Sequence, residues 1–187
     1  MRIIAGTRKG TRLIAPRSYS IRPTSDRVRE YIFSCLQTDI LDKTVLDLFA
    51  GTGAFGLEAI SRGAASVVFV DNSMNAVKLV RQNLQKLGIE AAVEKKSAEL
   101  FLRTCHYRFD FIFCDPPYEF QHFDLILRLI RQNGLLDKEG AVIYESSSRA
   151  ETVQEQGFQI SRQKEMGDTR ITFYMMDYED RNLSRDV

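Results

Sequence analysis

Apolar residues along this chain gather in short runs, and turn-forming residues or polar helical stretches separate the runs. Such runs are typical of strands that are buried on both faces of a sheet. They predict strands at 44–49, 66–70, 91–95, 109–114 and 141–145. Two further segments, 158–164 and 169–176, lie on either side of Gly167-Asp168, a spacing that is typical of a β-hairpin.

Between the predicted strands, apolar residues recur every three or four positions, which is the spacing of one face of a helix. One helix is expected to begin at Ser73 and to end at Gly88. Another carries apolar residues from Phe123 to Ile130 and should end at Gly134. Helices that alternate with buried strands indicate a mostly parallel sheet with helices on both faces. The predicted fold class is therefore α/β: a doubly wound, Rossmann-like sheet with a C-terminal antiparallel hairpin.

The first 24 residues follow a different pattern. Two apolar stretches, 3–4 and 13–14, lie on either side of a turn rich in Gly and Lys, which predicts a basic β-hairpin. Residues 1–25 carry a charge of +6 with no acidic residue, so the rest of the chain carries −5 of the net +1. This asymmetry favours a polyanionic partner, because contacts to phosphate dominate affinity for nucleic acids. The candidate RNA-binding residues are Arg8, Lys9, Arg12 and Arg22.

The pattern predicts one domain, 25–178, preceded by the basic arm, 1–24, and followed by a polar tail, 179–187. A chain of 187 residues can bury a sufficient core without disulfides. We expect no membrane partner, because no apolar run is long enough to span a bilayer and the amino terminus lacks the apolar stretch of a signal peptide. Three cysteines with no C-x-x-C pair and two histidines also favour a reducing, cytoplasmic location without a metal site.

A glycine-rich segment, Gly51-Thr52-Gly53-Ala54-Phe55-Gly56, follows the strand at 44–49 and precedes a short helix that should end near Arg62-Gly63. The G-x-G-x-x-G spacing lets a ligand approach the backbone where a strand turns into a helix. Asp71 ends the next strand, 20 residues after the first glycine, where it can accept hydrogen bonds from ribose hydroxyls. Any cofactor that contains adenosine fits this pair of features, NAD included.

Asp47 favours S-adenosylmethionine over NAD. It interrupts an apolar strand, and a buried carboxylate needs a partner because its unpaired burial is costly. An ammonium or sulfonium group supplies that partner, whereas a pyrophosphate would be repelled. The alternative is a structural role in which Asp47 caps a local turn. The candidate cofactor-binding residues are Asp47, Phe49, Gly51, Gly53, Asp71, Asn72, Ser97 and Ala98, with the last two expected near the adenine.

The segment Asp115-Pro116-Pro117-Tyr118 follows the strand at 109–114, at the sheet edge where ligands bind in open α/β folds. The prolines hold the chain extended and cannot donate backbone hydrogen bonds, so their carbonyls stay available as acceptors. An exocyclic amino group can donate one N–H to Asp115 and one to the Pro116 carbonyl. This would aim the nitrogen lone pair at an electrophilic methyl group. Tyr118 offers a face on which a flipped base can stack. These four are the candidate catalytic residues; a turn without function is the alternative.

The spacing Asp47-x-Phe49-x-Gly51-x-Gly53, followed by Asp115-Pro116-Pro117-Tyr118, resembles the class I S-adenosylmethionine-dependent amino-methyltransferases. The stretches that resemble the RsmD family in particular are Arg2-Ile3-Ile4-Ala5-Gly6, the R-P-T-x-D-R-V-R-E run at 22–30, and Gly167-Asp168-Thr169-Arg170. RsmD enzymes methylate guanine N2 in small-subunit (16S) ribosomal RNA. The resemblance covers nearly the whole chain.

The resemblance implies methyl transfer from S-adenosylmethionine to N2 of a specific guanine, in 16S ribosomal RNA or in an assembly intermediate of the small subunit. Direct displacement requires alignment rather than a covalent intermediate. The D-P-P-Y signature is shared with enzymes that act on adenine N6 and on glutamine side chains, so those acceptors remain alternatives. An NAD-dependent oxidoreductase and a non-catalytic RNA-binding assembly factor are the other readings of these motifs.

Overall fold

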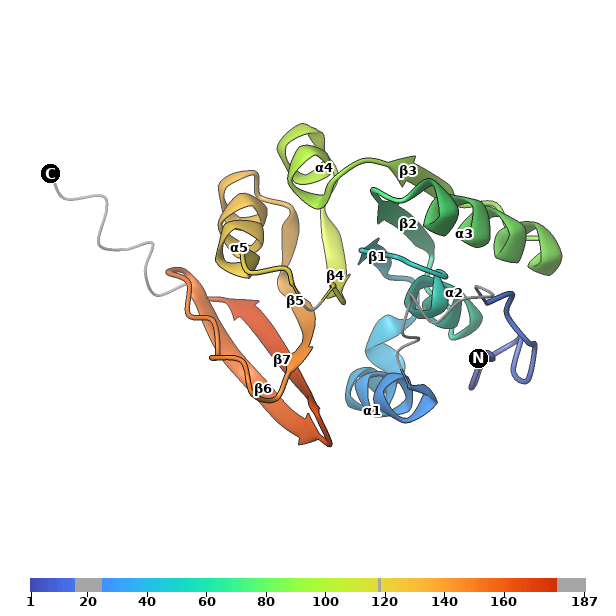
Figure 1. Ribbon diagram of the computed structural model, residues 1–187, viewed down its shortest axis with the longest axis horizontal. Helices are drawn as coiled ribbons and strands as arrows, with labels where there is room; N and C mark the ends of the chain where they lie inside the picture. The colour runs from blue at the N-terminus through green and yellow to red at the C-terminus, as the bar shows by residue number, and fades with distance from the viewer. Residues whose placement is uncertain (16–24, 118, 178–187) are drawn as a thin grey trace, which may run out of the picture.

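The strands form a single seven-stranded sheet in a computed structural model that describes residues 1–15, 25–117 and 119–177 (Figure 1). The strand order is β3-β2-β1-β4-β5-β7-β6. The strands are β1 Thr44–Leu48, β2 Ser66–Asp71, β3 Ala92–Lys95, β4 Phe109–Cys114, β5 Leu136–Ser147, β6 Phe158–Met166 and β7 Thr169–Met176. Pairs from β3 to β5 are parallel, and β7 is antiparallel to both β5 and β6. The predicted α/β sheet with a C-terminal antiparallel hairpin is confirmed.

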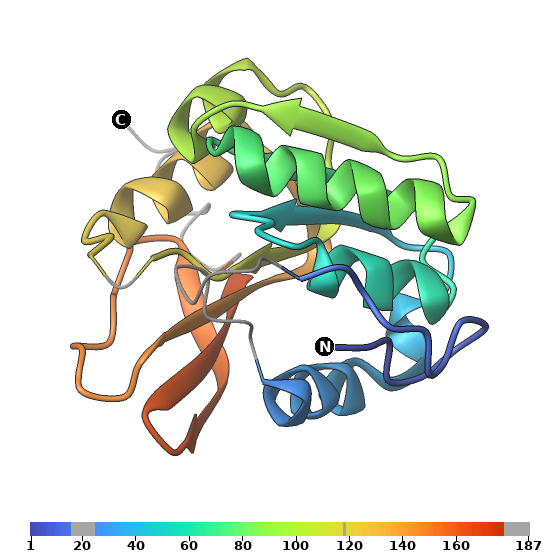
Figure 2. The ribbon, with the colours of Figure 1, turned by 45° about the vertical axis from the view of Figure 1, so that its right-hand side comes forward.

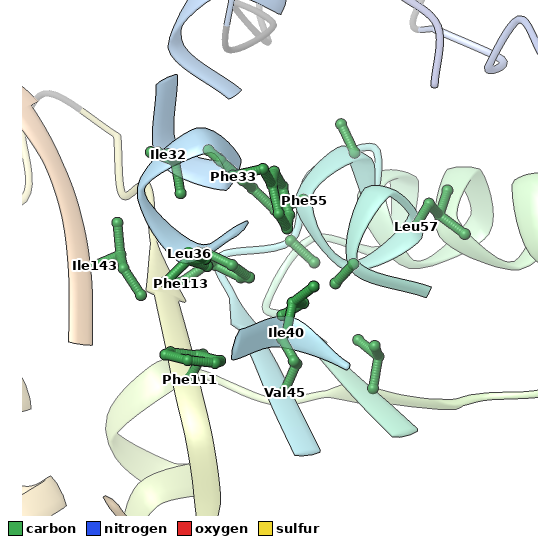
Figure 3. Close-up of a cluster of buried hydrophobic side chains, with 14 of the residues drawn as sticks. Ile32, Phe33, Leu36, Ile40, Val45, Phe55, Leu57, Phe111, Phe113 and Ile143 are labelled. Carbon is green, nitrogen blue, oxygen red and sulfur yellow. The ribbon is translucent and has the colours of Figure 1, made fainter. Parts of the chain in front are cut away.

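Helices cover both faces of the sheet. The helices are α1 Asp26–Leu36, a 3-10 turn η1 Gln37–Ile40, α2 Ala54–Ser61, α3 Met74–Leu87, α4 Ala98–Thr104 and α5 Phe123–Gln132. Apolar side chains of α1, α2 and α3 share one buried cluster with one face of the strands, and those of α4 and α5 share a second cluster with the other face. Figure 3 shows the first cluster, where the Phe113 ring on β4 lies 5.2 Å from the Phe55 ring on α2.

The predicted helix ends are confirmed where they can be checked. Ser73 caps α3 as predicted, because its side chain accepts a hydrogen bond from the Ala76 N–H, and Ser25 caps α1 in the same way through the Val28 N–H. Gly88 ends α3 in the left-handed conformation that favours glycine. Two elements differ from the prediction: α4 is an additional helix, and β5 begins at Leu136, ahead of the apolar run at 141–145.

The predicted N-terminal hairpin is present as a compact arm with one antiparallel bridge, between Arg2 and Arg12. Ile3 donates a backbone hydrogen bond to Thr11 and accepts one from Gly10. The arm packs on the domain, because Ile3 and Leu13 are both buried in the cluster that contains α1, α2 and α3. The boundary of the arm at residue 24 and the side chain of Arg22 lie outside the described residues, and so does the tail at 179–187. These three assignments stay predictions.

Within the described ranges, no helix combines the length and the apolar composition needed to cross a membrane.

Candidate active site

The predicted cofactor and catalytic residues gather at one edge of the sheet. Leu48 of β1 is in register with Val70 of β2 and with Cys114 of β4, and Asp71 is in register with Lys95 of β3. These four parallel strands therefore end side by side, and the loops that follow them lie together at the carboxyl edge (Figure 2). The structure brings together the described members of the predicted set: Asp47, Phe49, Gly51, Gly53, Asp71, Asn72, Ser97, Ala98, Asp115, Pro116 and Pro117.

The glycine loop after β1 has a left-handed backbone at three positions. The φ angles are 68° at Phe49, 56° at Gly51 and 77° at Gly53. Asp71 holds this loop, since its Oδ2 accepts a hydrogen bond from the Gly51 N–H at 2.9 Å and its Oδ1 accepts one from the Ser73 N–H at 2.8 Å. A carboxylate oxygen has a second lone pair, so both oxygens can also accept hydrogen bonds from the hydroxyls of a ribose.

The third glycine of the motif serves packing. A Cβ atom on Gly56 would lie 2.3 Å from the Phe69 ring and 2.8 Å from Val67, both on β2. Only glycine at this position lets α2 approach the sheet so closely. The motif thus combines a left-handed turn at Gly51 and Gly53 with a close helix–sheet contact at Gly56.

Asp47 is 2% exposed on β1, and its Oδ2 accepts a hydrogen bond from the Gly56 N–H at 2.9 Å. Burial, followed by the nearby charges of Asp115 and Asp71, raises the pKa of Asp47 to about 8, although the Gly56 hydrogen bond and the Arg29 charge oppose the shift. Asp47 therefore does help to fix a local turn, the structural alternative considered from sequence. A cation that binds near a carboxyl group with so high a pKa would strongly favour the ionised, carboxylate form of that group.

The loop after β4 is joined to the loop after β1. The Pro117 carbonyl accepts a hydrogen bond from the Phe120 N–H at 2.9 Å, which closes a turn. The Phe120 ring then meets the Phe49 ring edge to face, with centroids 5.1 Å apart. Tyr118, the predicted stacking residue, lies outside the described residues. The two loops that were expected to hold cofactor and acceptor thus lie against each other.

Cys114 and Tyr144 occupy the sheet beneath this edge. Burial is the main cause that raises the pKa of the Cys114 thiol well above its ordinary value, and it also raises the pKa of the Tyr144 hydroxyl to about 12. The Tyr144 ring stacks on Phe123 of α5 with centroids 3.5 Å apart. A thiol that stays protonated is a poor nucleophile, so Cys114 acts as a core residue. Among the described residues, no cluster of three or more metal-ligating side chains occurs.

Comparison with known proteins identifies the family. The family described as "Conserved hypothetical protein 95" matches residues 1–175. The chain is 37% identical over 147 residues to "Ribosomal RNA small subunit methyltransferase D" of Escherichia coli strain K12, covering 78% of this chain and 74% of that one. It is 36% identical over 180 residues to YlbH of Bacillus subtilis, covering 93% and 98% of the two chains. The solved structure of yhhF from Escherichia coli superposes with a TM-score of 0.86 at 32% identity, covering 95% and 98%.

The chain belongs to the RsmD family. It is an rRNA methyltransferase, and the Rossmann-like fold that was predicted for it is that of its structural relatives. Family membership also implies use of S-adenosylmethionine.

Arg29 is a residue of the RsmD-like run at 22–30 whose importance sequence reasoning missed. It is fully buried, and one guanidinium nitrogen donates to Asp26 at 2.7 Å and to the Arg2 carbonyl at 2.8 Å. Another donates to the carbonyl of Ala54, the first residue of α2, at 3.4 Å. Arg29 therefore joins the arm, α1 and the helix that follows the glycine loop. The sequence does carry a signal for this buried role: Arg29 follows Val28 at a helix position that would otherwise be apolar.

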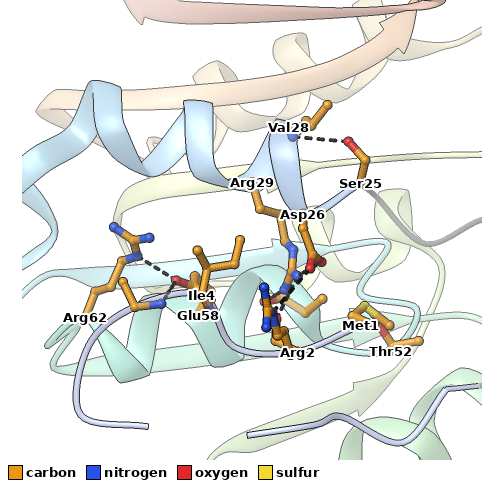
Figure 4. A network of polar contacts seen from close by, with 12 residues as sticks. Met1, Arg2, Ile4, Ser25, Asp26, Val28, Arg29, Thr52, Glu58 and Arg62 are labelled. Atoms are coloured by element: carbon orange, nitrogen blue, oxygen red, sulfur yellow. Dashed lines mark hydrogen bonds and ion pairs between the residues drawn. The ribbon is translucent and has the colours of Figure 1, made fainter. Parts of the chain in front are cut away.

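A second group of polar residues, also missed from sequence, clasps the arm. Glu58 of α2 is fully buried, and its carboxylate accepts backbone N–H bonds from Ile4 at 2.7 Å and Ala5 at 3.0 Å (Figure 4). Arg62 donates to the same carboxylate at 2.7 Å. On α3, the buried Asn83 side chain both accepts from the Ile14 N–H and donates to the Ile14 and Thr52 carbonyls. The arm is thus bound to α2 and α3 by its backbone.

The tip of the arm lies far from the glycine loop. The backbone N–H of Arg8 donates to Ser61, at the last residue of α2, and Lys86 near the end of α3 donates to the Arg12 carbonyl. Both helices begin at the carboxyl edge of the sheet and end toward the opposite edge (Figure 2). Because α2 has eight residues, its two ends are about 12 Å apart. The structure therefore does not bring Arg8 and Lys9 together with Asp115.

Proposed function

We propose that this chain transfers a methyl group from S-adenosylmethionine to N2 of a specific guanine in 16S ribosomal RNA, either in free RNA or in an assembly intermediate of the small subunit. One observation carries the proposal. Asp115 and Pro116 directly follow β4 beside the carboxyl end of β1, in a loop whose Phe120 ring contacts Phe49 of the glycine loop, in a member of a family that includes a ribosomal RNA small subunit methyltransferase.

The residues at the carboxyl edge fit the cofactor. Asp71, with Asn72, is assigned to the ribose hydroxyls, and Asp47, Phe49, Gly51 and Gly53 to the methionine end. The raised pKa of Asp47 supports this, because a buried carboxyl group gains most when a positive ammonium or sulfonium group lies near it. Once bound, the cofactor supplies an electrophilic methyl group on a positive sulfur.

The adenine is assigned to the start of α4. The Ser97 hydroxyl accepts a hydrogen bond from the Leu100 N–H at 3.2 Å and so caps this helix. Ser97 therefore already has a structural role, and the next residue, Ala98, is buried at the start of α4. We assign to this pair the role of a wall for the adenine ring, with specificity from backbone groups rather than from an acidic side chain.

The acceptor is held by the loop after β4. Asp115 accepts one N–H of the guanine amino group and the Pro116 carbonyl accepts the other, which turns the nitrogen lone pair toward the methyl group. The Pro117 carbonyl is engaged by Phe120, so its role is to shape the turn. Tyr118 keeps its predicted role as a stacking platform for the flipped base. After transfer, the methylated nitrogen is strongly acidic and releases its proton to Asp115 or to water.

The basic arm is assigned to RNA at a distance from the target nucleotide. Arg8, Lys9 and Arg12 belong to an arm whose tip is at the far end of α2, so they would hold the RNA flanking the target rather than the guanine itself. Arg22, which lies outside the described residues, keeps its predicted place among the RNA-binding residues.

The test is to treat 16S ribosomal RNA and small-subunit assembly intermediates with the enzyme and isotope-labelled S-adenosylmethionine. Digestion to nucleosides and mass spectrometry then identify the product. We expect one N2-methylguanosine per RNA, with fragment mapping to a single site. Label in N6-methyladenosine, or in protein glutamine, would contradict the proposal. The comparison of free RNA with assembly intermediates identifies which of them is the substrate.

A further inference from the structure

Glu145 lies beside Asp115 at the carboxyl edge. The last parallel pair between β4 and β5 is Cys114 with Tyr144, and Asp115 and Glu145 each follow by one residue. Glu145 is still within β5, paired with Ile171 of β7. Neighbouring strands are about 4.8 Å apart, so the backbones of the two acidic residues are separated by one strand spacing.

The two acidic side chains belong to the same face of the sheet. Phe113 and Ile143 pack in the cluster that contains α1, α2 and α3, whereas Cys114 and Tyr144 pack in the opposite cluster. Since successive side chains of a strand alternate between faces, Asp115 and Glu145 return to the face of Phe113 and Ile143. Asp47 shares this face, and the negative charge of Asp115 is one cause of the raised pKa of Asp47. Asp47 in β1, Asp115 directly after β4 and Glu145 in β5 thus place three carboxyl groups on one side of the site.

The edge of guanine that bears N2 has two neighbouring donors. The exocyclic amino group carries two N–H bonds, and the adjacent ring nitrogen N1 carries another. In adenine, the ring nitrogen N1 next to the exocyclic amino group has a lone pair and no hydrogen. Two adjacent carboxylates therefore match guanine, while the second one would repel the lone pair of adenine.

We propose that Glu145 accepts the N1–H of the target guanine while Asp115 accepts an N–H of its amino group, so that Glu145 selects guanine over adenine. The inference rests on the proposed function and names the residue behind its choice of base. Asp115 holds the reacting nitrogen, and Glu145 reads the neighbouring ring atom.

The test uses synthetic RNA in which the target guanine is replaced by 2,6-diaminopurine. This base keeps the 2-amino group but has a lone pair at N1 in place of the N1–H. The wild-type enzyme is expected to prefer guanine in kcat/KM by at least about tenfold, the order of discrimination of a well-placed hydrogen-bond contact to a base. In Glu145→Gln the amide can donate to the N1 lone pair, so the preference is expected to fall by about tenfold or more.

The control is Glu151→Gln, which changes an exposed acidic residue in the loop after β5 and is expected to leave the preference unchanged. A wild-type preference near one would overturn the inference without any variant. A preference that is the same in Glu145→Gln and in the wild type would also overturn it. In both cases continued methylation of guanine N2 by the wild type would leave the proposed function standing. Absence of guanine methylation by the wild type would overturn the proposed function itself.

Discussion

Two buried acidic residues close to α2 have opposite surroundings. Glu58, in the middle of the helix, is fully buried and accepts two backbone N–H bonds from the arm and one from the Arg62 guanidinium. Asp47, below the start of the helix, is 2% exposed, accepts one backbone N–H at Oδ2, and lies near the charges of Asp71 and Asp115. The protein places the Arg62 cation in contact with Glu58. The negative charges of Asp71 and Asp115 instead make ionisation of Asp47 harder.

The contrast separates a structural charge from a functional one. A buried carboxylate that the protein neutralises holds two segments together, and its loss leaves polar groups buried without partners. A carboxyl group whose pKa is raised by burial and by like charges costs stability, and such groups gather where a ligand supplies the missing charge. The arm clasp, which consists of Glu58, Arg62 and Asn83 with the backbone of the arm, is therefore tested by protein stability. The carboxyl edge is tested by ligand binding and activity.

The largest effect is expected from Glu58→Ala. Removing this carboxylate leaves the Ile4 and Ala5 N–H groups and the Arg62 guanidinium without their partner. Breaking a buried pair in this way costs about 3–5 kcal/mol in the free energy of unfolding. Urea denaturation measures the change. Glu30→Ala, at an exposed position on α1, is the matched control and should change the free energy by less than about 0.5 kcal/mol. A cost below about 1 kcal/mol for Glu58→Ala would mean that the arm is not held by this residue.

The next effect is expected at the carboxyl edge, from Asp115→Ala. Loss of an oriented acceptor should lower kcat by about 10²–10³, while the Kd of S-adenosylmethionine stays largely unchanged. Single-turnover kinetics and calorimetry measure the two quantities. Asp168→Ala, in the exposed turn between β6 and β7, serves as the control with normal turnover. Wild-type kcat in the Asp115 variant would remove this residue from the mechanism.

The carboxyl edge was predictable from sequence because its candidate site residues lie in short local motifs. Strand ends, the glycine loop and Asp115-Pro116 follow one another within a few residues, and a parallel sheet necessarily brings those ends together. The arm clasp was not predictable in this way. Glu58 and Arg29 bind backbone groups of the arm that lie more than 20 residues away in sequence. Arg29 belongs to the RsmD-like run at 22–30, but no spacing within that run indicates those partners.

The missed elements have local reasons. Helix α4 is only seven residues long, and its cap, Ser97, had been assigned to the adenine site alone. The apolar spacing of Ala98, Phe101 and Leu102 was the signal for it. The early part of β5 is polar, and the register shift between Phe109 and Phe111 lets it join β4 ahead of its apolar run. Short helices and irregular strand starts carry little periodic signal.

An effect of comparable size, spread over several pH units, tests Asp47. Its pKa is about 8 in the folded protein and about 3.9 in an unfolded chain, so folding takes up a proton between these values. Stability from this group is full below about pH 4 and is lost as pH rises toward 8, by up to about 1.4 kcal/mol per pH unit. Relative to the wild type, Asp47→Asn should gain stability steadily from pH 5 to pH 8 in urea denaturation. Parallel curves for the two proteins would show that Asp47 is ionised in the folded state.

The same series sharpens the comparison when the cofactor is added. If Asp47 lies by a positive group of S-adenosylmethionine, saturating cofactor should lower its pKa and flatten the wild-type pH dependence. The Asn variant should show no such change. A cofactor that stabilises both proteins equally at every pH would place the positive group elsewhere.

The smallest effect is expected at the arm tip. Each phosphate contact contributes about 0.7–0.9 to the slope of log K against log salt concentration for RNA binding. The double variant Arg8→Ala/Lys9→Ala should therefore reduce the magnitude of that slope by about 1.4–1.8. Filter binding over a salt series measures it. The matched control is Arg103→Ala/Lys138→Ala, at exposed positions on α4 and β5. Equal slopes for the two double variants would limit the tip to a structural role.

The order of strands in the sheet has a consequence for how the chain folds during synthesis. Strand β7 is made after β6, yet it lies between β5 and β6 and supplies Tyr174 and Met176 to the buried cluster shared with α4 and α5. Until β7 has been made, β5 is an open edge that can pair with another chain. The two-residue turn at Gly167-Asp168 lets β6 and β7 form a hairpin first, because local pairing closes a short loop quickly. Nascent chains that stall before Thr169 are therefore expected to aggregate, and the hairpin's docking on β5 to be the step that ends this exposure.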